Sequence, residues 1–243
     1  MVDPLEGARW KVRRAWEHLD KINAELLAFF NLAPYVVVPH RDGEHRWRIL
    51  IHVRQEPPPH IALQFGDAAH NIRSALDHLA QVLTGSSSNR QTQWPICDTP
   101  AKWDTAIRRL VGVDKRFYDA IRARQPFANP TEFGGLTILR ELDDADKHRV
   151  LLFAVAYSPF FEVSNPPNMR VVDRPIEPVY VEEGAMLCAV EGEPPSDMQV
   201  NVHSSTGYTV SFGVPPLTTD ANGLLEISWT VMEIIDCFAA MIS

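Results

Sequence analysis

Residues 66–83 carry the side chains of this sequence that are best suited to chemistry. At about 100° per residue, a helix over this range collects its polar side chains within roughly 120° of arc. These side chains are Asp67, His70, Asn71, Ser74, Asp77, His78 and Gln81, with Arg73 at their edge. A histidine transfers protons near neutral pH, a carboxylate orients it or binds a metal ion, and an arginine holds a phosphate. The pattern therefore indicates a site for acid–base chemistry or for metal binding.

The residue types on this polar side are unusual for the solvated face of a helix. Solvated faces favour Lys, Glu, Arg and Gln, which are good helix formers. This side has neither Lys nor Glu, and six of its seven positions hold Asp, Asn, Ser or His, which are poorer helix formers. Three interpretations follow: a solvated face, a buried structural network of hydrogen bonds, or a functional site.

A second polar cluster lies in the segment LTILRELDDADKHRVLL, residues 136–152. Its leucines mark a buried side and leave the polar residues near the junction with a predicted strand: Asp143, Asp146, Lys147, His148 and Arg149. This cluster fits a charged helix end, because basic residues near a helix C-terminus interact favourably with the helix dipole. Alternatively, Asp146 and His148 face the polar side of the 66–83 helix and form a pocket with it.

Three kinds of chemistry are open to such a pocket. A divalent transition metal would have as candidate ligands Asp67, His70, His78, Asp146 and His148. Metal-independent hydrolysis of a phosphodiester needs no cofactor, and it would use the pair of Arg73 for the phosphate and His78 for the proton. A non-enzymatic interaction or scaffold protein would need neither, and its polar side would then be a structural network.

Arg73-Ser74-Ala75-Leu76-Asp77-His78 resembles the signature of HEPN-type proteins, an arginine followed by four to six residues and a histidine. HEPN proteins are helical bundles, often dimeric, and many are metal-independent ribonucleases of toxin and defence systems. The resemblance implies that Arg73 is a phosphate ligand, that His78 is a general acid or base, and that RNA is a partner. Asp77, His70 and Asn71 complete the candidate catalytic set.

A longer stretch, HNIRSALDHL with DKHR downstream, resembles bacterial and phage-associated proteins of similar size that have no established activity. This resemblance covers roughly residues 60–155. Ser74 follows the arginine at a position where HEPN proteins typically have Asn, Asp or His. Arg73 and His78 are about 140° apart on an ideal helix, so they converge only on a bent helix or with a second subunit. Because HEPN proteins are often dimeric, the resemblance implies a homodimer.

The segment PHRDGEHRWRILIHVR, residues 39–54, is a second candidate contact with an anionic partner. Asp42-Gly43 favours a tight turn between two strands. Strand alternation places on one face Arg46, Arg48, His52 and Arg54. We expect Arg46, Arg48 and Arg54 to bind nucleic-acid phosphates. The alternative is an edge strand whose charges protect it from pairing with another chain.

The elements that must position these residues follow from the apolar spacing. That spacing predicts helices over residues 5–31 and 60–83, near 101–110 and 114–123, and around Leu136, Leu139 and Leu142. From Val150 the sequence becomes β-rich. After Asp220, an apolar stripe from Leu224 to Phe238 predicts a C-terminal helix, which can pack on the other helices or on a second copy of the chain.

This order of elements predicts an α+β fold. It consists of a helical bundle with long N-terminal, central and C-terminal helices, an antiparallel sheet from the second half, and an inserted β-hairpin. We expect one domain over residues 1–243. The helices fall mainly in 1–149 and 219–243, the β-rich part in 150–215 and the hairpin in 35–54.

Composition limits the class of protein. The 243 residues are 45% hydrophobic and 22% charged, which excludes a disordered chain. The net charge of -8 argues against a surface that binds nucleic acid everywhere. Positive charge is nevertheless concentrated near the start of the first helix, at Arg9, Lys11, Arg13 and Arg14.

The cellular compartment is indicated by cysteine usage and by missing apolar segments. Cys97, Cys188 and Cys237 are far apart and odd in number, which favours reduced thiols over a disulfide framework or a zinc motif. The sequence starts without the apolar core of a signal peptide, and no apolar run approaches the ~20 residues of a membrane span. We therefore expect a cytoplasmic protein that does not associate with a membrane.

Overall fold

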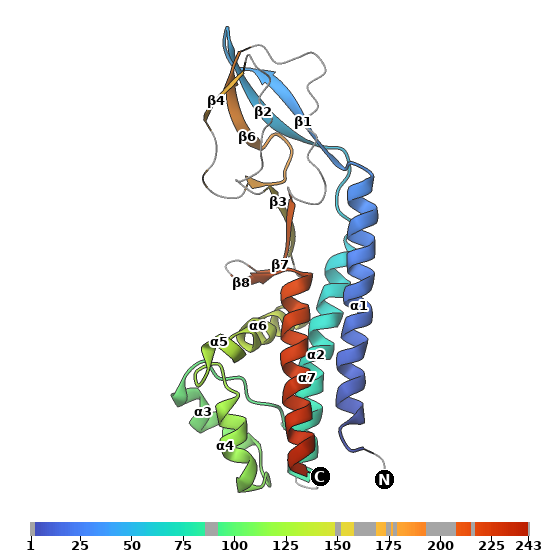
Figure 1. Ribbon diagram of the computed structural model, residues 1–243, viewed down its shortest axis with the longest axis vertical. Helices are drawn as coiled ribbons and strands as arrows, with labels where there is room; N and C mark the ends of the chain where they lie inside the picture. Colours follow the sequence, from blue (N-terminus) through green and yellow to red (C-terminus); the bar gives the residue numbers. More distant parts are fainter. Residues whose placement is uncertain are drawn as a thin grey trace. The chain divides into compact units, whose positions relative to one another are not determined.

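The computed structural model describes residues 3–85, 92–148, 152–157, 169–173, 176, 179–192, 208–214 and 217–242 (Figure 1). The chain divides into two compact units. Unit 1 comprises Met1–Asn23, His60–Leu152 and Phe212–Ser243, and unit 2 comprises Ala24–Pro59 and Phe153–Ser211. Of the residues named above, Arg149 and part of the predicted β-rich region at 150–215 lie outside the described residues.

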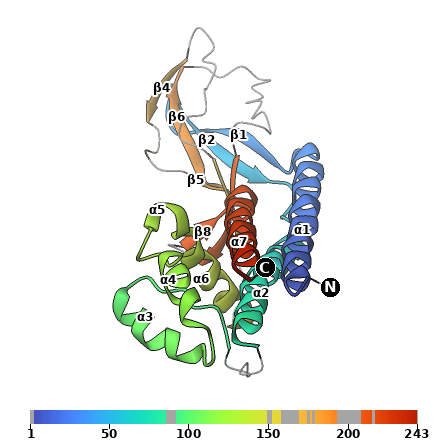
Figure 2. The ribbon, with the colours of Figure 1, turned by 60° about the horizontal axis from the view of Figure 1, so that its bottom comes forward.

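Three long helices lie side by side in unit 1 (Figures 1 and 2). They are α1 (Glu6–Asn31, up to Asn23 in this unit), α2 (His60–Thr84) and α7 (Ala221–Ile242). Their bounds agree with the predicted periodic segments. α6 (Gly135–His148) and α4 (Lys115–Ala123) also match the prediction, whereas the helix expected at 101–110 ends early as α3 (Pro100–Ala106) and a 3₁₀ turn (Ile107–Arg109). The short α5 (Pro130–Phe133) was not predicted.

The core of unit 1 forms where the apolar sides of the long helices meet. It contains Val12, Ala15 and Leu19 of α1, Phe65, Ile72, Leu76 and Leu79 of α2, and Val231, Ile235 and Phe238 of α7. Two polar contacts join α1 to α7: Trp16 Nε1 donates to Ser228 Oγ at 2.6 Å, and Arg9 contacts Asp236 at 2.9 Å. The apolar stripe of α7 therefore packs on the other helices of the same chain, and not on a second copy.

Unit 2 is built on a four-stranded antiparallel sheet of order β1-β2-β6-β4. Its strands are β1 (Tyr35–Arg41), β2 (Arg46–Val53), β4 (Arg170–Asp173) and β6 (Met186–Glu191). One face packs a core of Val37, Ile49, Ile51, Met169, Leu187, Cys188 and Val190. The predicted hairpin is therefore part of the main sheet, because β2 pairs with β6 of the second half.

The hairpin turns at the predicted Asp42-Gly43. The loop runs over residues 42–45 and is closed by the Asp42 N–H, which donates to the Arg46 carbonyl at 2.8 Å. Gly43 is not among the glycines with positive φ. Because Arg41 also donates to the carbonyls of Gly43 and Glu44, side-chain hydrogen bonds stabilise this loop.

The remaining strands form a second sheet of order β5-β3-β7-β8. They are β3 (Leu152–Tyr157), β5 (Val179–Tyr180), β7 (Tyr208–Val214) and β8 (Leu217–Thr219). Together, the helices and antiparallel strands confirm the predicted α+β class. Among the described helices, none is long and apolar enough to cross a membrane.

Candidate functional site

The polar side of α2 meets different neighbours in unit 1. Arg73 and Asp77 are directed toward the extended segment that precedes α3, residues 92–99, whereas His70 contacts α6. Asp67 and His70 are exposed, and Asn71, Ser74, Asp77 and His78 are half-buried. None of the three interpretations holds for the whole polar side, so each contact has to be considered separately.

Arg73 and Asp77 form a hydrogen-bonded network with Trp94, although Arg73 Nη1 and Trp94 Nε1 are buried without a hydrogen-bond partner among the described residues. Arg73 Nη2 lies 3.0 Å from Asp77 Oδ1 and donates to the Trp94 carbonyl at 2.9 Å. The same carboxylate oxygen accepts from the Trp94 N–H at 2.9 Å. The Arg73 side chain is only 10% exposed. Burial raises the pKa of Asp77, while Arg73 and the Trp94 N–H oppose that rise. The network holds the 92–99 segment on α2.

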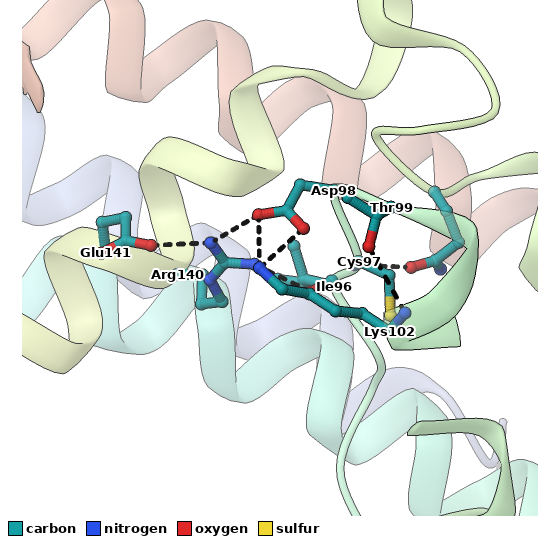
Figure 3. Close-up of polar contacts among 8 residues, drawn as sticks. Ile96, Cys97, Asp98, Thr99, Lys102, Arg140 and Glu141 are labelled. Carbon is teal, nitrogen blue, oxygen red and sulfur yellow. Dashed lines mark hydrogen bonds and ion pairs between the residues drawn. The ribbon is translucent and has the colours of Figure 1, made fainter. Parts of the chain in front are cut away.

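A second cluster holds the other end of the same segment (Figure 3). Arg140 of α6 donates to the Ile96 carbonyl at 3.1 Å and contacts Glu141 at 2.6 Å and Asp98 at 3.5 Å. Lys102 of α3 lies 2.7 Å from Asp98, and its hydrogen bond lowers the pKa of that carboxyl. The sequence did not predict a role for these residues. They connect α6, α3 and the 92–99 segment, and we call them the clamp.

Cys97 lies inside this clamp. Its backbone N–H donates to Gln125 Oε1 at 3.0 Å, and Gln125 Nε2 donates back to the Ile121 carbonyl of α4. Cys97 is 2% exposed, and burial raises the pKa of its thiol. A buried thiol with a raised pKa is a poor nucleophile, so Cys97 is a packing residue here.

His70 and α6 form the more open part of the site. His70 Nδ1 lies 2.9 Å from Asp143 Oδ1, and Lys147 contacts the second oxygen of the same carboxylate. The Asp143 side chain is 3% exposed, whereas that of His70 is 51% exposed. The polar cluster on α6 thus reaches α2 through Asp143. A buried carboxylate that binds one ring nitrogen orients the imidazole and leaves the other nitrogen toward solvent.

Asp146 lies against α2 at a glycine. A Cβ atom built on Gly66 would lie 2.1 Å from Asp146 Oδ1, so α2 accepts this carboxyl only because residue 66 has no side chain. Burial raises the pKa of Asp146, and the carboxylates of Asp67 and Asp143 raise it further. Negative charge is therefore concentrated around His70.

The raised pKa of Asp146 has a consequence for stability. A carboxyl whose pKa is raised in the folded state favours folding most below its usual value of 3.8 and opposes it as pH rises through the folded-state pKa. We therefore expect Asp146→Asn to raise the melting temperature at pH 7 by about 1–3 °C, with a gain that shrinks toward pH 4. Asp144→Asn, at an exposed position of the same helix, serves as the control. A gain independent of pH would contradict this origin.

His78 lies on the opposite edge of α2 from Arg73, next to α1. A Cβ atom built on Gly7 of α1 would be 3.4 Å from His78 Nδ1. The imidazole has no hydrogen-bond partner among the residues that the structure describes. Arg73 and His78 therefore point to different neighbours within one chain. Asn71 donates to the Asp67 carbonyl at 2.7 Å, a bond inside the helix that leads to no other element.

The proposed metal ligands are not assembled within the described part of unit 1. Asp67, His70 and Asp146 lie near enough to interact: the charge of Asp67 raises the pKa of Asp146, and that of His70 lowers it. His78 is on the α1 side, and the side chain of His148, the last residue of α6, lies outside the description. Among the described residues, no group of three or more His, Cys, Asp or Glu is arranged to hold a metal ion.

The arginines of the hairpin carry acidic neighbours. Arg46 and Arg48 lie 3.9 and 3.4 Å from Asp42, and His52 contacts Glu183 at 3.0 Å. Arg54 is exposed just after β2. Part of the positive charge predicted for a nucleic-acid contact is thus neutralised within unit 2.

Comparison of this chain with protein-family models, with curated proteins and with solved structures finds no match. The case for any function therefore depends on the contacts described above and on the sequence resemblance.

Proposed function

We propose that this chain is a HEPN-like, metal-independent ribonuclease in which His78 transfers the proton. The observation that carries the proposal is the position of His78: its half-buried imidazole lies beside Gly7 of α1 without a hydrogen-bond partner among the described residues. A general acid or base needs a ring nitrogen free to contact the reacting hydroxyl. In RNA cleavage without a metal, that hydroxyl is the ribose 2′-OH or the leaving 5′-oxygen.

The surroundings of His78 suit a phosphate better than those of His70. His70 is bound to Asp143 and lies among carboxylates, which repel an anionic backbone. His78 lies beside the basic start of α1. Lys11 follows Gly7 by one turn on the same face, about 6 Å along the helix, and has no partner among the described residues.

This proposal changes the role that the resemblance gives to Arg73. The guanidinium holds the 92–99 segment through Nη2, which contacts Asp77 and Trp94, and its Nη1, which has no hydrogen-bond partner among the described residues, is buried and so not exposed to a phosphate. We propose Lys11 as the cation that replaces it. Asp77 and Asn71 have no catalytic role in this proposal, because Asp77 accepts from the Trp94 N–H and Asn71 donates to the Asp67 carbonyl of its own helix. The free thiols fit action in the cytoplasm, and we propose that the protein acts as a homodimer.

Cleavage of single-stranded and structured RNA by purified protein in EDTA tests the proposal. We expect His78→Ala to lower the cleavage rate at least 100-fold, since a general acid or base contributes about 10²–10⁴-fold. His70→Ala, on the same helix, is the matched control and should retain most of the activity. Lys11→Ala should raise KM more than it lowers kcat. Wild-type protein that leaves both RNAs intact would overturn the proposal, as would a fully active His78→Ala variant.

A second candidate is a non-enzymatic interaction protein whose polar helix face is structural. The burial of Arg73 and its contacts with Asp77 and Trp94 favour it, because a catalytic arginine would be open to its ligand. It predicts no RNA cleavage together with a loss of about 1–3 kcal/mol in stability for Asp77→Ala, which orphans the Trp94 N–H. Unchanged stability in that variant would contradict it.

A further inference from the structure

Positive charge is concentrated in one segment of unit 1. Residues 100–124 contain seven Lys or Arg against three Asp, whereas the whole chain has 23 Lys or Arg against 31 Asp or Glu. The segment forms α3, the 3₁₀ turn and α4, which lie on one side of α7, while α1 lies on the other (Figures 1 and 2). The charge is therefore located away from α1 and from His78, which contacts α1.

Only part of this charge is neutralised within the chain. Lys102 is paired with Asp98 at 2.7 Å, and Arg116 with Asp114 at 3.4 Å. Four exposed cations have no acidic partner among the described residues: Arg108, Arg109, Lys115 and Arg122. The same helices carry two exposed carboxylates that form no ion pair in the described part of the chain, Asp104 and Asp119. Positive charge is thus in excess here after every ion pair has been counted.

The exposed side of α4 places an aromatic ring between two of these cations. Phe117 marks the buried side of the helix, and Lys115, Tyr118 and Arg122, at i, i+3 and i+7, share the exposed side. Tyr118 is 36% exposed. The Arg122 guanidinium lies 5.5 Å from the centroid of the Phe127 ring. Because an aromatic ring and not a carboxylate positions Arg122, its N–H donors are available to an anion.

We propose that Arg108, Arg109, Lys115, Tyr118 and Arg122, here called the α3–α4 surface, bind single-stranded RNA. Lys115 and Arg122 are about 10 Å apart along the helix, and the other two cations precede α4. Cations spread in this way match a chain of phosphates, whereas a small anion needs them gathered around one point. Tyr118 offers a ring on which an unpaired base can stack, which a duplex does not provide.

The choice of RNA as the strand rests on the proposed function, but the α3–α4 surface is separate from His78. It holds RNA and does not cleave it. Its role also differs from that predicted for the hairpin, where Asp42 neutralises part of the charge of Arg46 and Arg48.

Fluorescence anisotropy of a labelled single-stranded RNA of about 12 nucleotides, titrated with His78→Ala protein in EDTA, tests this surface. We expect Lys115→Ala with Arg122→Ala to raise the dissociation constant at least about tenfold at ~0.1 M salt. The slope of its logarithm against the logarithm of the salt concentration should become shallower by about 1.4, since each phosphate contact on a single strand contributes about 0.7.

A matched control removes the same charge from α1. Arg13 and Arg14 are paired with Glu6 and Glu17, so Arg13→Ala with Arg14→Ala should leave the salt slope unchanged. Tyr118→Ala separates stacking from charge: it should raise the dissociation constant at least about fivefold at an unchanged slope, while Tyr118→Phe binds like the parent protein. Melting curves show that each variant is folded.

Protein that does not bind the RNA at ~0.1 M salt would overturn the proposal, as would a folded Lys115→Ala, Arg122→Ala variant that keeps the parent slope. Tighter binding of single-stranded DNA of the same sequence, or displacement of the RNA by polyglutamate at equal charge, would assign the surface to another partner. Because the measurement uses His78→Ala protein, it does not depend on cleavage. RNA binding through this surface together with a wild type that never cleaves RNA would overturn the proposed nuclease and support this inference.

Discussion

Replacing Arg73 by alanine is expected to lower the free energy of unfolding by about 3–5 kcal/mol, because loss of one partner of a buried ion pair leaves the other charge uncompensated. Asp77, whose side chain is 21% exposed, would lose its cation, and the Trp94 carbonyl would lose its donor. Burial already raises the pKa of Asp77, and Arg73 opposes that rise. Without Arg73 the pKa rises further, so the destabilisation is greatest at neutral pH and smaller in acid.

Urea unfolding followed by circular dichroism measures this effect, and two variants separate its parts. Arg73→Lys keeps the charge but lacks the planar fork that contacts Asp77 and the Trp94 carbonyl together, so an intermediate loss is expected. Asp77→Asn retains an oxygen for the Trp94 N–H while it leaves the guanidinium unpaired. If Arg73→Ala instead unfolds within ~1 kcal/mol of the wild type, the network is not structural, and Arg73 returns as a candidate phosphate ligand.

The helices of this fold could be predicted because their signal is local. Apolar residues repeat at helical spacing through α1, α2 and α7, and these helices begin and end near the predicted residues. The hairpin could also be predicted from its two β-rich runs. Its pairing with β6 could not, because a partner strand more than a hundred residues away leaves no mark in the pattern of β2.

The residue types of the site could be predicted from the sequence, but most of the contacts between these residues could not. The unusual residues of α2 do take part in defined contacts, and Asp143 and Asp146 of α6 do reach that helix. Trp94 was missed because it contacts α2 through its backbone atoms, which are the same for every residue type. Arg73 and Asp77 are four residues apart, a spacing that favours an ion pair, so this local signal was present in the sequence.

Two glycines lie where another element approaches their helix, and the sequence alone does not show why glycine is present there. Gly66 lies inside α2, where glycine costs about 1 kcal/mol relative to alanine, and Gly7 is the second residue of α1. The structure gives each a neighbour: His78 approaches α1 at Gly7, and Asp146 approaches α2 at Gly66. A glycine inside a helix therefore marks a place where another element comes close, but only the fold shows which element that is.

Gly66→Ala is the second substitution with a large expected effect, and its sign should depend on Asp146. The added Cβ atom would lie 2.1 Å from Asp146 Oδ1, which forces the short carboxyl or the backbone of α6 to move. We expect a net loss of about 1–3 kcal/mol in the free energy of unfolding, since overpacking outweighs the gain in helix propensity.

In an Asp146→Ala background the clash is gone, and the same substitution should stabilise the protein by up to about 1 kcal/mol through helix propensity alone. Gly7→Ala is the matched control, because its Cβ atom would meet His78 at an ordinary 3.4 Å. A double-mutant cycle of urea unfolding measures the coupling between residues 66 and 146. If Gly66→Ala costs the same in both backgrounds, then Asp146 does not lie on α2 in solution, and the carboxylates around His70 do not form one cluster.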